Sequence, residues 1–362
     1  MNIYQSNERI FGLDLARALA VIGMILVNYK LAMNAQDAGP VWLQKVTEAL
    51  EGRASALFVI LAGIGVSLMT AKARASGVRE LILTAQKTLY RRAAFLFVTG
   101  MLLLAIGWSA DILHYYAVFL AVAALLLQST DRKFLLGAAG ILVVTIFQLL
   151  FLDYSIGWSA NYHEYENVWT LSGFTRNLLF NGFHPVFPWL AFFLLGMWLG
   201  RKDWLTRKKA RTRLLLIAAA AAVFMEMVSR YMMKGLTPLL SSEGARYLFG
   251  TKPMPPNLMY FFAAAASALT VLIICIQAAE RWRESRWVQT FIRTGQLSLT
   301  HYVAHIMVGL APLQLTGLLE NGSIVFSTIY AFIFYAAAAV FSFYWKNHHS
   351  RGPLEQLMRR WE

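Results

Sequence analysis

FGLDLARALAVIGMILVNYKLAM, residues 11–33, is long and apolar enough to cross a membrane as one helix, yet it carries Asp14, Arg17 and Asn28. At 1.5 Å per residue, Asn28 lies about 21 Å along such a helix from Asp14, so polar groups fall in both halves of the bilayer. Ionisable residues inside a span are costly and tend to face a bundle interior or a water-filled cavity. The stretch therefore predicts a membrane helix that lines a functional site, with its polar groups along one continuous passage.

The composition places the whole chain in a membrane. Of its 362 residues, 58% are hydrophobic and 14% are charged, a balance that excludes an ordinary soluble domain. We expect an all-α integral membrane helix bundle, formed by residues 1–362 as a single membrane domain. The runs that can cross about 30 Å of hydrocarbon give about ten transmembrane helices, near residues 12–33, 54–72, 93–109, 111–128, 134–152, 186–200, 213–233, 258–279, 297–317 and 324–345.

The distribution of charge predicts the topology. The net charge is +14, and 25 of the 33 Lys and Arg residues fall on one side of the ten-span arrangement. The positive-inside rule then places both termini and the basic loops 72–92 and 200–213 in the cytoplasm. The bilayer therefore explains the basic residues, and no nucleic-acid partner is expected. We expect a multi-pass protein of a bacterial cytoplasmic (inner) membrane, with a homodimer as a compatible assembly.

The remaining segments are predicted to cover the outer face. Residues 153–185 are rich in Trp, Tyr, Asn and Gly, and residues 234–257 contain four prolines, so both segments read as external caps. Residues 40–52 predict a short helix at the membrane interface. The one cysteine, Cys275, excludes an intramolecular disulfide and is expected to be a packing residue.

The first candidate site is the segment SADILHYYAVF, which carries Asp111 and His114 at the outer mouth of the fourth span. An Asp and a His three residues apart on a helix can form a hydrogen bond, and an imidazole oriented by a carboxylate suits general base chemistry near neutral pH. The alternative is that Asp111 caps the helix while His114 is an interfacial residue. In the topology above, His114 shares a depth with Asn28.

Two further pairs lie toward the cytoplasmic side. Asp14 and Arg17 are neighbours on one helix face, where they form either part of a binding site or an ion pair that anchors the helix. His301 and His305, in LSLTHYVAHIMVG, share a face of the ninth span. Zinc would need a third ligand, so no metal is predicted. The two histidines line the path of a cofactor arm or form helix–helix hydrogen bonds.

Charged residues also lie at both mouths of the bundle. Glu226 and Arg230 are four residues apart in the outer half of the seventh span, as an ion pair or a substrate contact. Arg53 and His184 are expected at the outer mouth.

At the cytoplasmic mouth, Arg91 and Arg92 lead into the third span. Guanidinium groups there suit a phosphate-bearing ligand. No nucleotide-binding glycine loop is present, so coupling to nucleotide hydrolysis within this chain is not expected.

The stretch LDLARALAVIGMILVNY resembles the opening helix of the transmembrane acyltransferases: heparan-alpha-glucosaminide N-acetyltransferase, its bacterial relatives and the YeiB-like membrane proteins. Their motif runs L-D-x-x-R-G-x-A, followed by an apolar run that ends in V-N. The later segments DILHYYAVF, PWLAFFLLGMWLGR, LSLTHYVAHI and RGPLEQLMRR also match in order. The resemblance therefore covers the chain nearly end to end.

The resemblance implies a bundle of ten or eleven helices that takes acetyl-CoA from the cytoplasm and delivers acetyl to an amino sugar on the far side. Asp14 and Arg17 match the L-D-x-x-R motif, Asn28 matches the helix-end Asn, and His305 matches the Y-V-x-H of the later helix. The family has a His about eleven residues after that Asn, where this chain has Gly39. Direct transfer between two bound substrates is thus favoured over an acetyl-His intermediate.

We therefore expect a membrane acyltransferase that uses cytoplasmic acyl-CoA, most simply acetyl-CoA, to modify an amine or hydroxyl of a small-molecule acceptor at the outer side, such as a sugar or envelope metabolite. His114, oriented by Asp111, would be the base, and Asn28 would stabilise the oxyanion. Asp14, Arg17, Arg91, Arg92, His301 and His305 would hold the donor, and Arg53, His184, Glu226 and Arg230 the acceptor. The alternatives are a proton-coupled transporter of small solutes or lipids and a catalytically silent relative.

Overall fold

The protein is a bundle of helices, here in a computed structural model that describes residues 9–36, 39–159, 162–319 and 321–362. Within those ranges it contains no β-strand. The elements are α1 (Phe11–Ala32), α2 (Val41–Leu50), α3 (Arg53–Met69), α4 (Ala71–Ser76), α5 (Arg79–Ala105), α6 (Leu113–Leu125), α7 (Asp131–Phe151), α8 (Leu171–Arg176), the π-helix η1 (Asn177–Asn181), α9 (Val186–Leu199), the 3-10 helix η2 (Asp203–Leu205), α10 (Lys208–Phe249), α11 (Leu258–Arg281), α12 (Arg286–Gln296), α13 (Ser298–Met307), α14 (Ala311–Leu315), α15 (Ile324–His348) and α16 (Pro353–Trp361).

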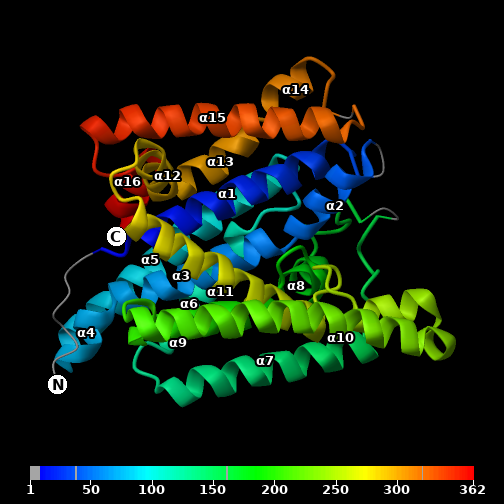
Figure 1. Cartoon of the computed structure of the whole chain (residues 1–362), viewed down its shortest axis with the longest axis horizontal. Helices are drawn as coiled ribbons and strands as arrows, with labels where there is room; N and C mark the ends of the chain where they lie inside the picture. Colours follow the sequence, from blue (N-terminus) through cyan, green and yellow to red (C-terminus); the bar gives the residue numbers. More distant parts are fainter. Residues whose placement is uncertain (1–8, 37–38, 160–161, 320) are drawn as a thin grey trace.

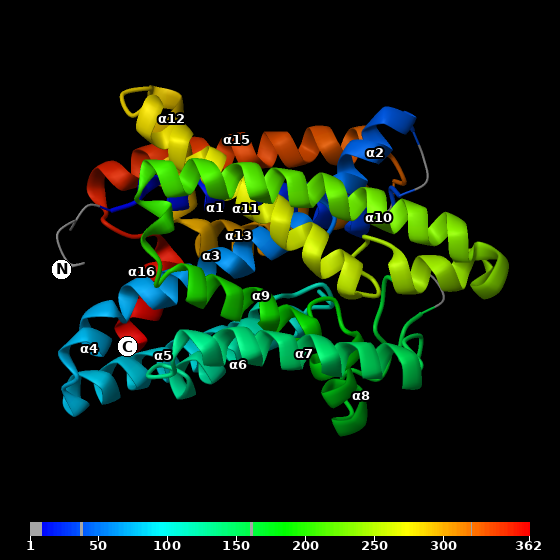
Figure 2. The same ribbon diagram turned by 60° about the horizontal axis from the view of Figure 1, so that its bottom comes forward.

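The long helices run roughly along one direction, and the short elements gather at the two ends. In Figure 1, α4, α12 and α16 lie at one end of the bundle, whereas α2 and α14 lie toward the other. Figure 2 shows the same separation of α4 from α2 in a second orientation. The basic segments that the sequence assigns to one side of the membrane are therefore together at one end of the molecule.

The helices long and apolar enough to cross a membrane number seven over the described ranges. An eighth span results if the pair Leu171–Asn181 and Val186–Leu199, bent by 48°, crosses as one unit. The all-α membrane bundle that the sequence predicts is therefore confirmed. The number of full-length spans is lower than the ten expected.

Two of the expected spans, near 111–128 and 297–317, are replaced by the short helices α6 and α13. With 13 and 10 residues, they are about 20 and 15 Å long, against about 30 Å of hydrocarbon. The chain before α6 is irregular from Trp108 onward, and α13 ends at Met307 before a turn and the separate helix α14. Most of α6 is buried among the surrounding helices, although Leu125 at its C-terminal end is exposed.

The segments between the spans are more helical than the sequence suggests. The proline-rich segment 234–257 was expected to be a cap, but α10 continues through it to Phe249 and changes direction at Ser241, where φ is 64°. The basic segment 72–92 likewise consists mainly of α4 and the first turns of α5. Helix α2 matches the helix predicted for 40–52, and its Val41, Trp42 and Val46 side chains are exposed.

Helix α1 lies against α3, α11, α12, α13 and α15, and small residues let the backbones approach closely. A methyl group at Gly12 would lie 2.3 Å from Cα of Ile276 on α11, and one at Gly295 would lie 1.8 Å from the carbonyl oxygen of Asp14. Between α3 and α9, a methyl group at Gly196 would lie 2.2 Å from the carbonyl oxygen of Ile60. Close packing of small residues is a main source of helix association in lipid.

Replacement of Gly196 by leucine should separate α3 from α9. We expect Gly196→Leu to lower the free energy of unfolding by about 1–3 kcal/mol, because the new side chain meets rigid backbone. The measurement is thermal unfolding in a fixed detergent. Gly140→Leu on α7 is the matched control, since a methyl group there meets no atom within 4 Å. Equal unfolding midpoints for the two variants would contradict this packing.

Candidate functional site

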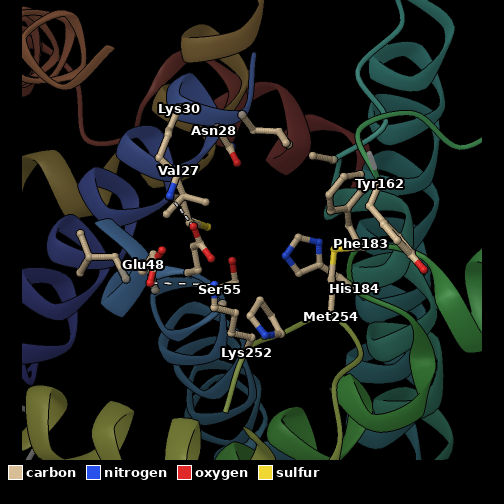
Figure 3. A pocket seen from close by; sticks show the side chains of 18 of the residues that line it. Val27, Asn28, Lys30, Glu48, Ser55, Tyr162, Phe183, His184, Lys252 and Met254 are labelled. Carbon is tan, nitrogen blue, oxygen red and sulfur yellow. Dashed lines mark hydrogen bonds and ion pairs between the residues drawn. The ribbon is translucent and has the colours of Figure 1, made fainter. Parts of the chain in front are cut away.

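A cavity of about 290 Å³ lies beside the second half of α1, at the end of the bundle that carries α2. Its walls come from α1, α2, α3 and α9 and from the segments before α6, α8, α9 and α11. Figure 3 shows the side chains of Asn28, Ser55 and His184 directed into it. The polar, charged and aromatic residues of the lining include Asn28, Lys30, Glu48, Glu51, Ser55, His184, Trp189 and Lys252.

Asn28 is held in place by a histidine from a distant part of the chain. Its Nδ2 lies 2.9 Å from Nε2 of His305. The other ring nitrogen, Nδ1, contacts the backbone oxygen of Tyr302, which requires a proton on Nδ1. Nε2 is then an acceptor, so the Asn28 amide donates to it. Tyr29 reinforces the contact, because its hydroxyl donates to the backbone oxygen of His305 at 3.0 Å.

Asp111 and His114 form the hydrogen bond that their spacing predicts, but they do not line the cavity. His114 Nδ1 lies 2.9 Å from Asp111 Oδ2, and the Tyr302 hydroxyl lies 3.4 Å from Asp111 Oδ1. The His114 side chain is completely buried, and its Nε2 has no hydrogen-bond partner in the parts of the chain that the structure describes. Asp111 also accepts a hydrogen bond from the His114 backbone N–H at 3.1 Å, so it caps the start of α6 and joins this helix to α13, while His114 lies outside the cavity lining.

Two histidines line the cavity, His163, whose Nε2 lies 2.6 Å from Gln36 Nε2, and His184. His184 was predicted as a site residue. It follows Phe183 in the turn between η1 and α9, and its ring lies 4.6 Å from that of Trp189 in an edge-on contact. Its Nδ1 is buried and has no hydrogen-bond partner among the described residues. The sequence placed His184 at the outer mouth as a substrate contact, and the structure brings it into the same cavity as Asn28.

Two Lys–Glu pairs in the lining were missed by the sequence analysis. Lys30 Nζ lies 2.5 Å from Glu51 Oε1, and the Lys30 side chain is only 5% exposed. Lys252 Nζ lies 3.9 Å from Glu48 Oε2 at the more open side. A lysine inside an apolar helix, two residues after Asn28, was the signal that could have identified the first pair.

Asp14 is enclosed at the other end of α1. Its carboxylate contacts Arg17 at 2.6 Å, Arg9 at 2.9 Å and Gln296 at 3.3 Å, and only 2% of the side chain is exposed. These contacts favour the anchoring ion pair over a binding site.

The cavity does not extend to Asp14. Met24 is the lining residue of α1 nearest to Asp14 in the sequence, and Val21 between them is fully buried. The continuous passage expected along α1 is therefore closed in this structure.

The charged residues predicted at the outer mouth stabilise contacts between helices. Arg53 contacts Glu226 and donates to the backbone oxygen of Ala263 at 3.2 Å and to Ser267 at 3.1 Å. The expected pair of Glu226 with Arg230 is not formed, because Glu226 faces α3 while Arg230 is exposed. Neither Arg53 nor Glu226 is part of the cavity lining.

The residues predicted to hold a donor at the basic end also have protein partners. Arg91 and Arg92 both contact Glu362, the latter at 2.6 Å. His301 Nε2 lies 2.6 Å from Ser342 Oγ on α15, which is the helix–helix hydrogen bond considered above. In the described parts of the chain, no group of three His, Cys, Asp or Glu residues is placed to hold a metal ion.

Helix α16 holds the start of α13, the helix that carries His305. The Glu355 carboxylate accepts hydrogen bonds from the backbone N–H groups of Leu299 at 2.8 Å and Thr300 at 3.1 Å, and from the Thr300 hydroxyl at 2.5 Å. Burial raises the pKa of the Glu355 carboxyl, although these hydrogen bonds oppose the shift. A carboxylate at this position satisfies N–H groups that a helix start leaves free.

Removal of this cap should loosen α13. We expect Glu355→Ala to lower the free energy of unfolding by about 1–2 kcal/mol, because the N–H groups of Leu299 and Thr300 lose their acceptor. Gln356→Ala, at the exposed neighbouring position, is the control. Thermal unfolding in detergent measures both variants, and a Glu355→Ala protein as stable as the control would contradict the proposed cap.

Two family models match the chain. The model described as a protein of unknown function (DUF418) matches residues 199–362. The model described as heparan-alpha-glucosaminide N-acetyltransferase, catalytic, matches residues 9–234, more than half of the chain. A comparison with curated individual proteins finds no significant match. The chain therefore belongs to the family of the heparan-alpha-glucosaminide N-acetyltransferase catalytic domain, a membrane acyltransferase-like family, as the resemblance of its opening helix suggested.

Proposed function

We propose that this protein is a membrane acyltransferase that moves an acyl group, most simply acetyl, from a cytoplasmic acyl-CoA to a small acceptor bound in the cavity. The observation that carries the proposal is the presence of Asn28 and His184 in one lining, with Asn28 oriented by His305. Family membership supports the reaction class.

In the proposed reaction, His184 takes the proton of the acceptor hydroxyl or amine as it attacks the thioester carbonyl. The Asn28 amide donates a hydrogen bond to the carbonyl oxygen as negative charge develops there. The role of base passes from His114 to His184, because His114 has no exposed surface. Gly39 stands where the family resemblance places a histidine, so the acyl group passes directly to the acceptor.

The donor must approach from the basic end of the bundle. A volume of about 290 Å³ is at the small end for ligand pockets, so it suits the acceptor and the acyl group, while the nucleotide part of CoA stays outside. Arg17 is partly exposed, and Arg91 is exposed beside its contact with Glu362. The cavity ends at Met24 and Val21 is fully buried beyond it, so passage of the acyl arm along α1 would require these side chains to move.

Acetyl-CoA consumption by the purified protein tests the reaction. With a panel of monosaccharides and amino sugars as acceptors, we expect release of the CoA thiol. Asn28→Ala should slow it by about 10²–10³-fold, and His184→Gln by about 10²–10⁴-fold. His348→Ala, at an exposed position on α15, should leave the rate unchanged. Proton-coupled solute uptake by proteoliposomes without thioester consumption would instead identify a transporter.

Sidedness has a separate test, for which the single buried Cys275 gives a low background. Glu166→Cys and Thr206→Cys place thiols at exposed positions, one in the segment 153–185 and one at the basic end. With a membrane-impermeant maleimide, we expect labelling of Glu166→Cys in intact bacterial cells and of Thr206→Cys only after permeabilisation. The reverse pattern would contradict an outward-facing cavity.

A further inference from the structure

We infer that the cavity takes an uncharged polyhydroxylated acceptor, a neutral sugar or polyol, and acylates one of its hydroxyl groups. The inference rests on the proposed function and concerns its acceptor. Each charged side chain of the lining already has a partner of opposite charge within the protein.

Both carboxylates of the lining lie beside an ammonium group. Glu51 pairs with the buried Lys30, which also contacts the Thr47 hydroxyl at 3.4 Å. Glu48 pairs with Lys252. Figure 3 shows Lys30 and Glu48 on the side of the cavity opposite His184. The described lining thus contains no carboxylate that is free to receive a cation.

A protonated amine would therefore enter the cavity at a cost. The ammonium group would lose its hydrating water without gaining a carboxylate as partner. Removing an unpaired charge from water costs free energy and weakens binding. A hydroxyl group loses less, and it can exchange hydrogen bonds with Ser55, Asn28 and the outer oxygens of the two carboxylates. The nonpolar face of a sugar ring can lie against Phe183, which lines the cavity and is partly exposed.

The position of His184 in the lining supports the same acceptor. A neutral amine attacks a thioester without prior loss of a proton, whereas a hydroxyl group needs a base. His184 has a buried Nδ1 with no acceptor in the described structure, so the ring gains nothing from carrying a standing positive charge. It is placed to act as a neutral base.

The reaction then balances without a further reactant. The acceptor oxygen bonds to the thioester carbonyl carbon, and the carbon–sulfur bond breaks. The hydroxyl proton passes to His184 and from there to the thiolate, which leaves CoA as its thiol. The product is an ester. Mild base cleaves an ester but leaves intact the amide that an amine acceptor would form, so base treatment distinguishes the two products.

Glucose and glucosamine form a matched pair of acceptors that differ at one substituent. At about pH 6.5, where the amine is protonated, we expect kcat/KM with acetyl-CoA to favour glucose by about tenfold or more. Mass spectrometry should show a base-labile ester. Preferential formation of a base-stable amide would overturn the inference while leaving the proposed acyltransferase intact.

A charge variant tests the cause of the preference. Lys252→Met leaves Glu48 without its partner, and we expect the preference to shift toward glucosamine by about fivefold. Lys45→Met removes the same charge from an exposed position of α2 outside the lining, and it should leave the preference unchanged. A shift of equal size in both variants would contradict a role for the pairs.

Binding measured without any donor separates this inference from the proposed function. Calorimetry of the full-length protein in nanodiscs should show tighter binding of glucose than of glucosamine, whether or not acetyl-CoA is consumed. If acyl transfer fails for every acceptor but this difference persists, the proposed reaction falls and the neutral-ligand site remains. Tighter binding of glucosamine would overturn the inference.

Discussion

An ionisable side chain inside a bilayer must find its partner within the protein, because the surrounding hydrocarbon provides neither water nor counter-ions. This constraint organises the bundle at every depth. Asp14 is enclosed by two arginines, Arg53 joins α3 to α10 through Glu226, and Lys30 joins α1 to the turn between α2 and α3 through Glu51. Residues that resemble isolated functional groups in the sequence thus become the links that position the helices.

The two short helices have a different role. Neighbouring helices cover most of α6 and the face of α13 that carries His301, Tyr302 and His305. The polar groups of these two short helices therefore face protein, where a lipid-facing position would be costly. Asp111 at the start of α6 contacts Tyr302 on α13, and one turn later His305 contacts Asn28. The polar network beside the cavity therefore depends on where these helices begin and end.

Neither of the two matched regions forms the site alone. Residues 9–234 contribute Asn28, Glu48 and His184, whereas the region 199–362 contributes His305 on α13 and Lys252 near the cavity mouth. The region of unknown function thus supplies the side chain that orients Asn28. Through Glu355, it also supplies the cap that holds α13. Chemistry in the cavity would require both regions.

The sequence by itself determined the membrane class, the opening helix with its three polar residues, and the contact between Asp111 and His114, because apolar length, composition and the spacing of near neighbours in the chain are local properties. Only the tertiary structure decided that Asn28 meets His305, that Glu226 pairs with Arg53 and that His184 reaches the cavity in place of His114. Each of these depends on the rotation and depth of one helix relative to another. Packing of small residues and pairing of buried charges set the rotation and depth of each helix, and both involve residues from separate segments of the chain.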